Sequence, residues 1–274
     1  MNETIRCSDV DPIRQGDIII FSSANESPTS PEFAVVINAD CDLAHGKVDG
    51  VLALLPIFSF HSYLEAFWVK SHLLSEFSQN IEWILGACGI EKAEAEDLAR
   101  WIESDNPMAI ASSLIGAHAV PTKKHAELHQ RVNKCAIIAS SQGLEGFKRV
   151  CSLDPDPSRY ARKHIEAAKG AIGDGHFFLS EISGQEGLGF VVRMRRILSI
   201  EATNCYRSVS DMRAHAPDTK TSAARVARLT PTYQHRIAQL FAYQFSRIGL
   251  PDETTELSKL AVDDIVSLMA GAQK

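Results

Sequence analysis

The sequence predicts a mixed α+β fold, in which a small β-barrel is interrupted by a large helical insertion and followed by a C-terminal helical hairpin. Three observations support this prediction. Short apolar runs rich in β-branched residues flank a long middle segment, the middle segment repeats its apolar residues every three to four positions, and the C-terminal residues form two amphipathic stretches. The chain of 274 residues is long enough to bury a substantial core.

The barrel strands are expected in two separated parts of the chain. Apolar runs bounded by glycine, proline and polar residues lie at residues 18–21, 33–38, 51–55, 176–179 and 190–200. Neither part has enough strands to close a barrel alone. We therefore expect residues 12–57 and 174–202 to pair in one sheet; the alternative is two separate domains.

The insertion between these parts, residues 58–173, is predicted to be mainly helical. From residue 60 to residue 114 the large apolar side chains recur at helical spacing, and the alternation typical of strands is absent. Residues 123–172 continue the helical pattern. Pro155 and Pro157 predict an interruption there, because two prolines cannot both lie inside a helix.

Two further segments complete the chain. Residues 203–229 are predicted to be a basic connecting segment. Residues 230–274 predict the helical hairpin: Thr230 suits a helix cap, and Pro231 suits the first helical position. An apolar stripe follows, and a second amphipathic helix is expected at about residues 253–269, so the pair should pack on the body or on a partner.

Composition excludes several classes of protein. Apolar residues make up 45% of the chain and charged residues 23%, which excludes disordered, collagen-like and low-complexity chains. The formal net charge of −6 argues against an electrostatic nucleic-acid binder, although a local basic patch could still bind one. No secretory signal or membrane-spanning run is evident, and the six scattered cysteines fit neither a disulfide framework nor a zinc ribbon. We therefore expect a cytoplasmic protein without membrane contact.

Several predicted strands resemble those of a known family. Residues 16–20, 33–37 and 51–57 (GDIII, FAVVI and VLALLPI) resemble the opening strands of the MazF/PemK-like SH3-type barrels, and residues 189–192 (GFVV) resemble their return strand. This resemblance implies an SH3-like β-barrel. The chain is more closely similar to larger uncharacterised bacterial proteins that combine such a barrel with an Asp-Cys-Asp-Leu motif, found here at residues 40–43, and a C-terminal Arg-Ile-Gly-Leu-Pro.

The resemblance also implies a function. It suggests a bacterial cytoplasmic binding module, in a toxin–antitoxin or phage-conflict system, that engages a protein or nucleic-acid partner. In the toxin branch, RNA cleavage is associated with an arginine near the Ala-Val-Val strand and a hydroxyl residue directly after Pro-Ile. Here that arginine is absent, and Phe58 stands before Ser59. The enzyme alternatives are a MazF-like endoribonuclease and a hydrolase that uses Asp40, Cys41 and Asp42.

The strongest candidate site is the cluster of Asp40, Cys41, Asp42 and His45, which follows a predicted buried strand. Three explanations are open. The aspartates bond turn amides while Cys41 fills the core. Alternatively, the carboxylates bind a divalent cation or perform acid–base chemistry, or Cys41 is a nucleophile activated by His45 or by the distant His176. The sequence leaves the identity of any cofactor or metal unknown.

A basic segment is the second candidate. Residues 193–228 hold eight basic and three acidic residues, a net charge of +5. Arg193, Arg195 and Arg196 lie within the strand predicted at residues 190–200, where they could follow a phosphate backbone. The same charges could instead pair with acidic helices or face solvent. Only Tyr206 is aromatic in this segment, so a stacking platform for single-stranded nucleic acid is not evident.

A third pattern is the pair His125 and His129, which lie one helical turn apart and could ligate a metal if a third ligand joined them. The pattern is not HExxH, because glutamate stands at position 127. Basic residues flank the pair, so a solvated basic face is the preferred interpretation.

We predict that the protein lacks MazF-type RNA cleavage activity, because the arginine is absent and Phe58 replaces the hydroxyl residue. Expression in a bacterial host should leave messenger RNA intact, as measured by sequencing of total RNA. Loss of host messenger RNA that Ser59→Ala abolishes would contradict this prediction.

Overall fold

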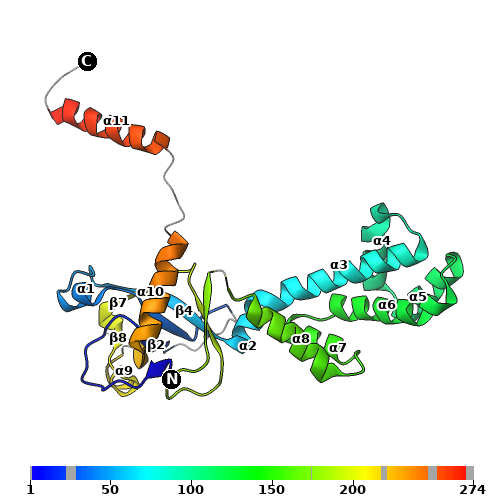
Figure 1. The fold of residues 1–274 in the computed structure, drawn as a ribbon, viewed down its shortest axis with the longest axis horizontal. Coiled ribbons are helices and arrows are strands. Elements are labelled where there is room, and N and C mark those ends of the chain that lie inside the picture. The colour runs from blue at the N-terminus through cyan, green and yellow to red at the C-terminus, as the bar shows by residue number, and fades with distance from the viewer. Residues whose placement is uncertain (1, 23–28, 174, 217–220, 246–251, 270–274) are drawn as a thin grey trace.

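The computed structural model describes residues 2–22, 29–173, 175–216, 221–245 and 252–269 of the chain. Figure 1 shows a curled sheet with helix α10 (Pro231–Phe245) beside it, and a long helical body that extends away from the sheet. The protein is therefore mixed α and β, as the sequence predicts.

The sheet is built from β1 (Thr4–Ile5), β2 (Asp17–Phe21), β3 (Phe33–Val36), β4 (Val51–Ser59), β5 (His176–Leu179), β6 (Phe190–Arg193), β7 (Leu198–Glu201), β8 (Cys205–Tyr206) and β9 (Ala223–Leu229). The strand order within the described residues is β1-β9-β2-β3-β4-β6-β5, with β7 also paired to β4 and β8 to β9. All of these pairs are antiparallel except β8 with β9, and the sheet curls into a half-barrel.

The predicted pairing of the two β-rich segments is confirmed. Strand β4 precedes the helical insertion, and it pairs with two strands that follow the insertion. Ile57 of β4 lies opposite Val192 of β6, and Val51 of β4 lies opposite Glu201 of β7. The insertion therefore interrupts one sheet and does not separate two.

The central strands are buried on both faces, which explains why their sequences are almost continuously apolar. Val35 and Leu55 belong to a core that also contains Ile237 of α10. Their neighbours Val36 and Leu54 belong to a second core on the opposite face, since successive side chains alternate along a strand.

The predicted connecting segment, residues 203–229, is wrong in one respect. It contains β8, helix α9 (Val209–His215) and β9, and β9 lies between β1 and β2 within the sheet. The strand has the sequence AARVARL, in which alanine and arginine are poor indicators of a central strand. Its position is fixed by contacts that a pattern of hydrophobicity cannot reveal.

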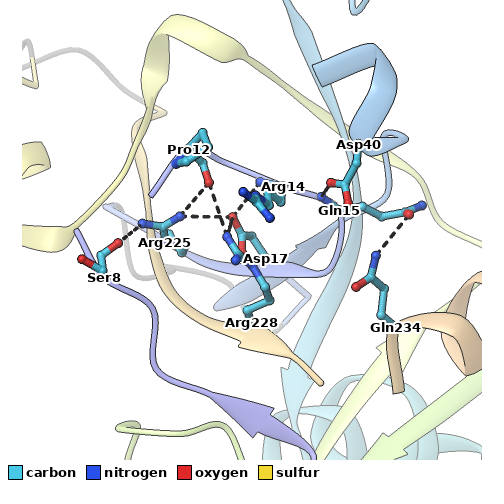
Figure 2. A network of polar contacts seen from close by, with 9 residues as sticks. All are labelled: Ser8, Pro12, Arg14, Gln15, Asp17, Asp40, Arg225, Arg228 and Gln234. Carbon is cyan, nitrogen blue, oxygen red and sulfur yellow. Dashed lines mark hydrogen bonds and ion pairs between the residues drawn. The ribbon is translucent and has the colours of Figure 1, made fainter. Parts of the chain in front are cut away.

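A buried ion-pair network provides those contacts. Asp17 at the start of β2 is fully buried, and its carboxylate binds Arg225 and Arg228 of β9 (Figure 2). Arg228 donates to both carboxylate oxygens, and Nη1 of Arg225 lies 3.4 Å from Oδ2. Arg225 also donates to two carbonyl oxygens of the N-terminal loop. The network therefore ties this loop to both strands.

A β-bulge allows both arginines to reach the same carboxylate. Ile18 pairs with Ala227, whereas the next residue of β2 pairs with Arg225, so one residue of β9 is left over. On a regular strand, two residues three positions apart face opposite sides of the sheet. The extra residue shifts this alternation and turns Arg225 and Arg228 to the same side.

The helical insertion contains α2 (Phe60–Tyr63), the π-helix η1 (Leu64–Trp68), α3 (Val69–Cys88), η2 (Lys92–Glu94), α4 (Ala95–Ser104), α5 (Pro107–Ala117), η3 (Thr122–Lys124), α6 (His125–Ala139), α7 (Gly143–Cys151) and α8 (Pro157–Gly170). The predicted interruption is confirmed, because α8 begins at Pro157 and Asp156 caps it. One apolar core is formed by α3, α4, α5 and α6, and a second is formed by η1, α3, α6, α7 and α8. No helix among the described residues is both long and apolar enough to span a bilayer.

The C-terminal region contains α10 and α11 (Asp252–Met269). Helix α10 begins at Pro231, as predicted, and it buries Ile237 in the core of the sheet. Thr230, the predicted cap, directs its hydroxyl toward the carbonyl oxygen of Glu3 at 3.2 Å, which ties α10 to the N-terminal segment. The turn of the predicted hairpin, residues 246–251, lies outside the described residues.

We expect Asp17→Asn to reduce the free energy of unfolding by roughly 3–5 kcal/mol, because it leaves two guanidinium charges without their buried partner. Chemical denaturation monitored by circular dichroism measures this change. Asp97→Asn is the matched control, because Asp97 pairs with Arg100 on an exposed helix face, where an ion pair contributes about 0–1 kcal/mol. Equal effects of the two substitutions would show that the buried network does not stabilise the sheet.

Candidate metal centre

The site begins where the insertion leaves the sheet, at the π-helix η1. A π-helical turn widens the backbone spacing and is frequent at functional sites. Trp68, the last residue of η1, stacks on His72 of α3 with ring centroids 4.4 Å apart. Phe147 of α7 contacts both rings edge-on. The orientation of the His72 imidazole is therefore fixed by aromatic packing.

Glu65 of η1 fixes the neighbouring helix. Its Oε2 accepts a hydrogen bond of 2.7 Å from the backbone N–H of Leu144, in the first turn of α7. Gly143 precedes Leu144 with a φ of +61°, and an added Cβ would collide with the Glu65 carboxylate. The positive φ therefore favours glycine at position 143, and a larger residue would also have to displace the Glu65 carboxylate from Leu144.

Two helices present the functional side chains. His72 and Glu76 lie one turn apart on α3, and Tyr160 and His164 lie one turn apart on α8, so each pair projects from one helix face. The ring centroids of His72 and His164 are 4.8 Å apart. One ligand atom each from His72, Glu76 and His164 lies within 4.8 Å of the others. In the described part of the chain, these three form the one such group of histidine, cysteine or acidic residues.

The carboxylate of this group is held by a lysine. Lys134 of α6 forms an ion pair with Oε2 of Glu76, and the Tyr160 hydroxyl lies 2.9 Å from Nζ of Lys134 and 3.2 Å from Oε2 of Glu76. Burial alone would raise the pKa of Glu76, but the hydrogen bond and charge of Lys134 outweigh it and hold this pKa below its ordinary value. Burial likewise opposes the charged form of Lys134, yet its bonds to Glu76 and Tyr160 raise the pKa above the ordinary value.

The two imidazoles are prepared to be ligands. Burial, aided by neighbouring positive charge, lowers the pKa of both His72 and His164, which favours the neutral imidazole that metals bind. Nε2 of His72 is buried and has no hydrogen-bond partner among the described atoms. A buried nitrogen without a partner costs free energy unless a ligand occupies it. Two imidazoles and a carboxylate are a ligand set suited to zinc and similar transition metals, and such a site keeps further positions open.

In comparisons with protein-family models, with curated proteins and with solved structures, no significant match to this chain was found.

The predicted cluster at Asp40, Cys41 and Asp42 lies in the short helix α1 (Asp40–Ala44), on the sheet. The Asp40 carboxylate accepts a hydrogen bond of 2.8 Å from the backbone N–H of Gln15, an amide of the loop before β2 and not of its own turn (Figure 2), and Oδ1 of Asp42 lies 3.6 Å from Sγ of Cys41. The predicted burial of Cys41 is wrong, because this residue is exposed. Within the described residues, the cluster does not gather its ligand atoms into a metal-binding group, His45 included.

His176, the proposed distant partner of Cys41, lies at the start of β5. Its ring packs edge-on against Tyr63 of α2, with centroids 5.5 Å apart. Strand β5 is the last strand beyond β6 in the sheet order, whereas α1 follows β3 on the other side of β4. The contacts of His176 therefore belong to the junction with the helical insertion.

The three predicted nucleic-acid-binding arginines each have a contact within the chain. Arg193 lies over the ring of Phe67, 4.0 Å from its centroid. Arg195 donates to the side chain of Gln244 in α10 at 3.2 Å, and Arg196 lies 3.5 Å from the carbonyl oxygen of Thr29. These contacts divide the three side chains between different parts of the molecule.

His72, Glu76 and His164 were not among the residues predicted from the sequence. One signal was present, since histidine and glutamate four residues apart on a helix, together with a second histidine on another helix, are a recurrent ligand arrangement. The histidine pair singled out from the sequence was His125 and His129. In the structure the side chain of His125 bonds the carbonyl oxygen of Val120 at 3.0 Å, and these two histidines form no metal-binding group among the described residues.

We expect Gly143→Ala to destabilise the protein by more than about 1 kcal/mol, because alanine is strained at positive φ and its Cβ meets the Glu65 carboxylate. The measurement is the midpoint of thermal unfolding. Gly86→Ala is the control, because Gly86 lies inside α3 with open space around it, and alanine there should be neutral or stabilising. A Gly143→Ala protein as stable as the wild type would contradict this account of the α7 terminus.

Proposed function

We propose that this protein is a metal-dependent binding module whose helical insertion holds one divalent transition-metal ion through His72, Glu76 and His164. Two observations on the same side chains carry the proposal: one ligand atom each from His72, Glu76 and His164 lies within 4.8 Å of the others, and the imidazole of His72 has a buried Nε2 without a partner among the described atoms. Metal–ligand bonds to nitrogen and oxygen are about 2.0–2.2 Å long, so two ligand atoms of a tetrahedral site lie about 3.3–3.6 Å apart. Side-chain movements of about 1–1.5 Å close the site.

The ligand chemistry favours zinc, cobalt or nickel over magnesium or calcium. Imidazole is a ligand of intermediate softness that suits the later transition metals, whereas magnesium and calcium prefer sites made of oxygen atoms. Three protein ligands leave at least one coordination position for water or a second molecule.

The barrel is part of the same proposal. The curled antiparallel sheet is compatible with an SH3-like barrel of the MazF/PemK-like type. From the resemblance of the strand sequences we further propose a bacterial cytoplasmic protein of a toxin–antitoxin or phage-conflict system. We also propose that α10 and α11 form the predicted hairpin and engage a protein partner. The described side chains of α11 include exposed Leu257, Leu260 and Ile265, and exposed apolar residues of this kind are typical of a surface that another surface covers.

The alternatives have less geometric support. A nucleic-acid interface at Arg193, Arg195 and Arg196 would need these side chains to turn from their contacts within the chain toward one groove. A hydrolase centred on Cys41 would need a base bonded to that thiol. Among the described contacts, the Cys41 thiol lies 3.6 Å from Oδ1 of Asp42; His45 caps the same short helix α1, and His176 packs against Tyr63.

We expect one equivalent of Co²⁺ or Zn²⁺ to bind the purified, chelator-treated protein, as measured by isothermal titration calorimetry. Substitution of a ligand, His72→Ala or His164→Ala, should weaken binding by at least about 100-fold. The metal should also raise the thermal midpoint of the wild type, because a ligand that binds only the folded state stabilises it.

Two control variants test the position of the site. His61→Ala removes an exposed histidine of α2 and should leave the affinity unchanged. Asp40→Ala with Asp42→Ala removes the carboxylates that the sequence favoured and should also leave it unchanged. If the aspartate variant loses the metal while His72→Ala retains it, the proposed site is wrong.

A further inference from the structure

Lys134 contacts both the proposed metal site and a neighbouring cavity. Its ammonium group binds Glu76 of the proposed metal site, and its side chain also lines a cavity of about 150 Å³ on the outer side of that site. Tyr160 likewise contacts Glu76 and lines the cavity. The remaining lining residues are Asn80, Glu127, Gln130, Arg131, Val150, Leu153 and Asp154. A change in the contacts of Glu76 therefore alters the positions of two side chains that line the cavity, Lys134 and Tyr160.

The charged side chains that line this cavity each have an ion-pair or hydrogen-bond partner while Lys134 remains on Glu76. Arg131 donates twice to one oxygen of Glu127, at 2.9 and 2.7 Å, and once to Asn80. The Asp154 carboxylate accepts a hydrogen bond of 2.9 Å from the backbone N–H of residue 156. Lys134 is thus the cation whose partner lies outside the cavity, in the metal site.

A metal ion would compete with Lys134 for that partner. The side chains of Lys134 and Glu76 are only 18% and 15% exposed, so water screens the charges of this site poorly. An ion bound to His72, His164 and Glu76 would place two positive charges next to the ammonium group that holds the same carboxylate. Repulsion at this separation favours a state in which Lys134 has left Glu76.

We propose that metal binding releases Lys134 into the cavity and thereby creates a binding site for a tetrahedral oxyanion, so that the metal and the anion bind cooperatively. This inference rests on the proposed metal site and names the class of its second ligand. In the liganded state Lys134 donates to the anion, and the Tyr160 hydroxyl and the Gln130 amide complete the polar contacts.

The space fits this ligand class. One water molecule needs about 10–15 Å³ of cavity volume, so the cavity has room for a sulfate or phosphate group. A second, more open hollow of about 590 Å³ adjoins the cavity and shares Asp154 and Tyr160 with it. Arg159 and Lys163 also line this hollow. It has room for the remainder of a molecule that carries the oxyanion as a phosphoryl group.

The test is a titration of the full-length protein with Co²⁺ by isothermal calorimetry in three buffers: without oxyanion, with sodium sulfate, and with phenyl phosphate at equal ionic strength. We expect saturating sulfate or phenyl phosphate to tighten Co²⁺ binding at least about fivefold, and Co²⁺ to tighten anion binding by the same factor, since coupling between two sites is reciprocal. If phenyl phosphate increases the Co²⁺ affinity more than sulfate does, the preferred ligand is a phosphoryl group on a larger molecule. If the two anions increase it equally, the preferred ligand is the free oxyanion.

The variant Lys134→Met distinguishes two roles of Lys134: competing with the metal for Glu76, or orienting Glu76 toward the metal. If Lys134 competes with the metal, this variant binds Co²⁺ more tightly than the wild type in the absence of anion, and its affinity no longer responds to sulfate. Lys47→Met is the matched control, because Lys47 is exposed and lies next to α1 on the sheet; it should retain the wild-type coupling. Circular dichroism verifies that both variants are folded, and the wild-type coupling is measured independently of either.

The outcomes distinguish this inference from the proposed function. If Co²⁺ binds in a His72-dependent manner but neither anion changes its affinity, the coupling is overturned and the metal site stands. If Lys134→Met weakens Co²⁺ binding, Lys134 orients Glu76 as a supporting residue, and release is overturned. If Co²⁺ does not bind at all, both are overturned.

Discussion

The buried carboxylate of Asp17 is the constraint on which the sheet depends. A charge without access to water is tolerated only when it is fully paired, and here the pairing requires two arginines of β9 and the bulge that turns both toward β2. The same strand end holds the rest of the N-terminal region in place. Gln15, two residues earlier, bonds Asp40 of α1 through its backbone and Gln234 of α10 through its side chain (Figure 2). Elements far apart in the sequence are thus positioned around one loop.

The parts of the fold that could be predicted are those specified by apolar periodicity. The helical insertion, the interruption before Pro157 and the pairing of two β-rich segments could be predicted because the spacing of apolar residues in each segment indicates which of its faces is buried. Strand β9 could not be predicted in this way, because its alanines and arginines are specified by Asp17 on another strand. The candidate metal site could not be predicted for a related reason: His72 and His164 lie on separate helices, and only tertiary packing brings their ring centroids to within 4.8 Å of each other.

At the junction between the sheet and the insertion, the residues of η1 make specific aromatic contacts with both parts of the molecule. Phe67 of η1 packs against Phe58 of β4 and lies beneath the guanidinium of Arg193 in β6. The next residue, Trp68, stacks on His72. One π-helical segment therefore contacts both the sheet and the candidate metal centre, and its irregular turn directs neighbouring side chains to these two environments. A regular α-helix would distribute the same residues over different faces.

The way in which the insertion enters and leaves the sheet has a consequence for the order of assembly. It starts beside β4 and returns at β5, and the rings of Phe60 and Phe178 meet at this point with centroids 5.5 Å apart. The helical body contains many backbone hydrogen bonds that are local in sequence, whereas β4 and β6 must find each other across more than a hundred residues. A helical body that folds first holds its two ends together and removes much of the entropy of closing that loop. The folded insertion would in this way hold the ends of β4 and β5 close together before the rest of the sheet forms.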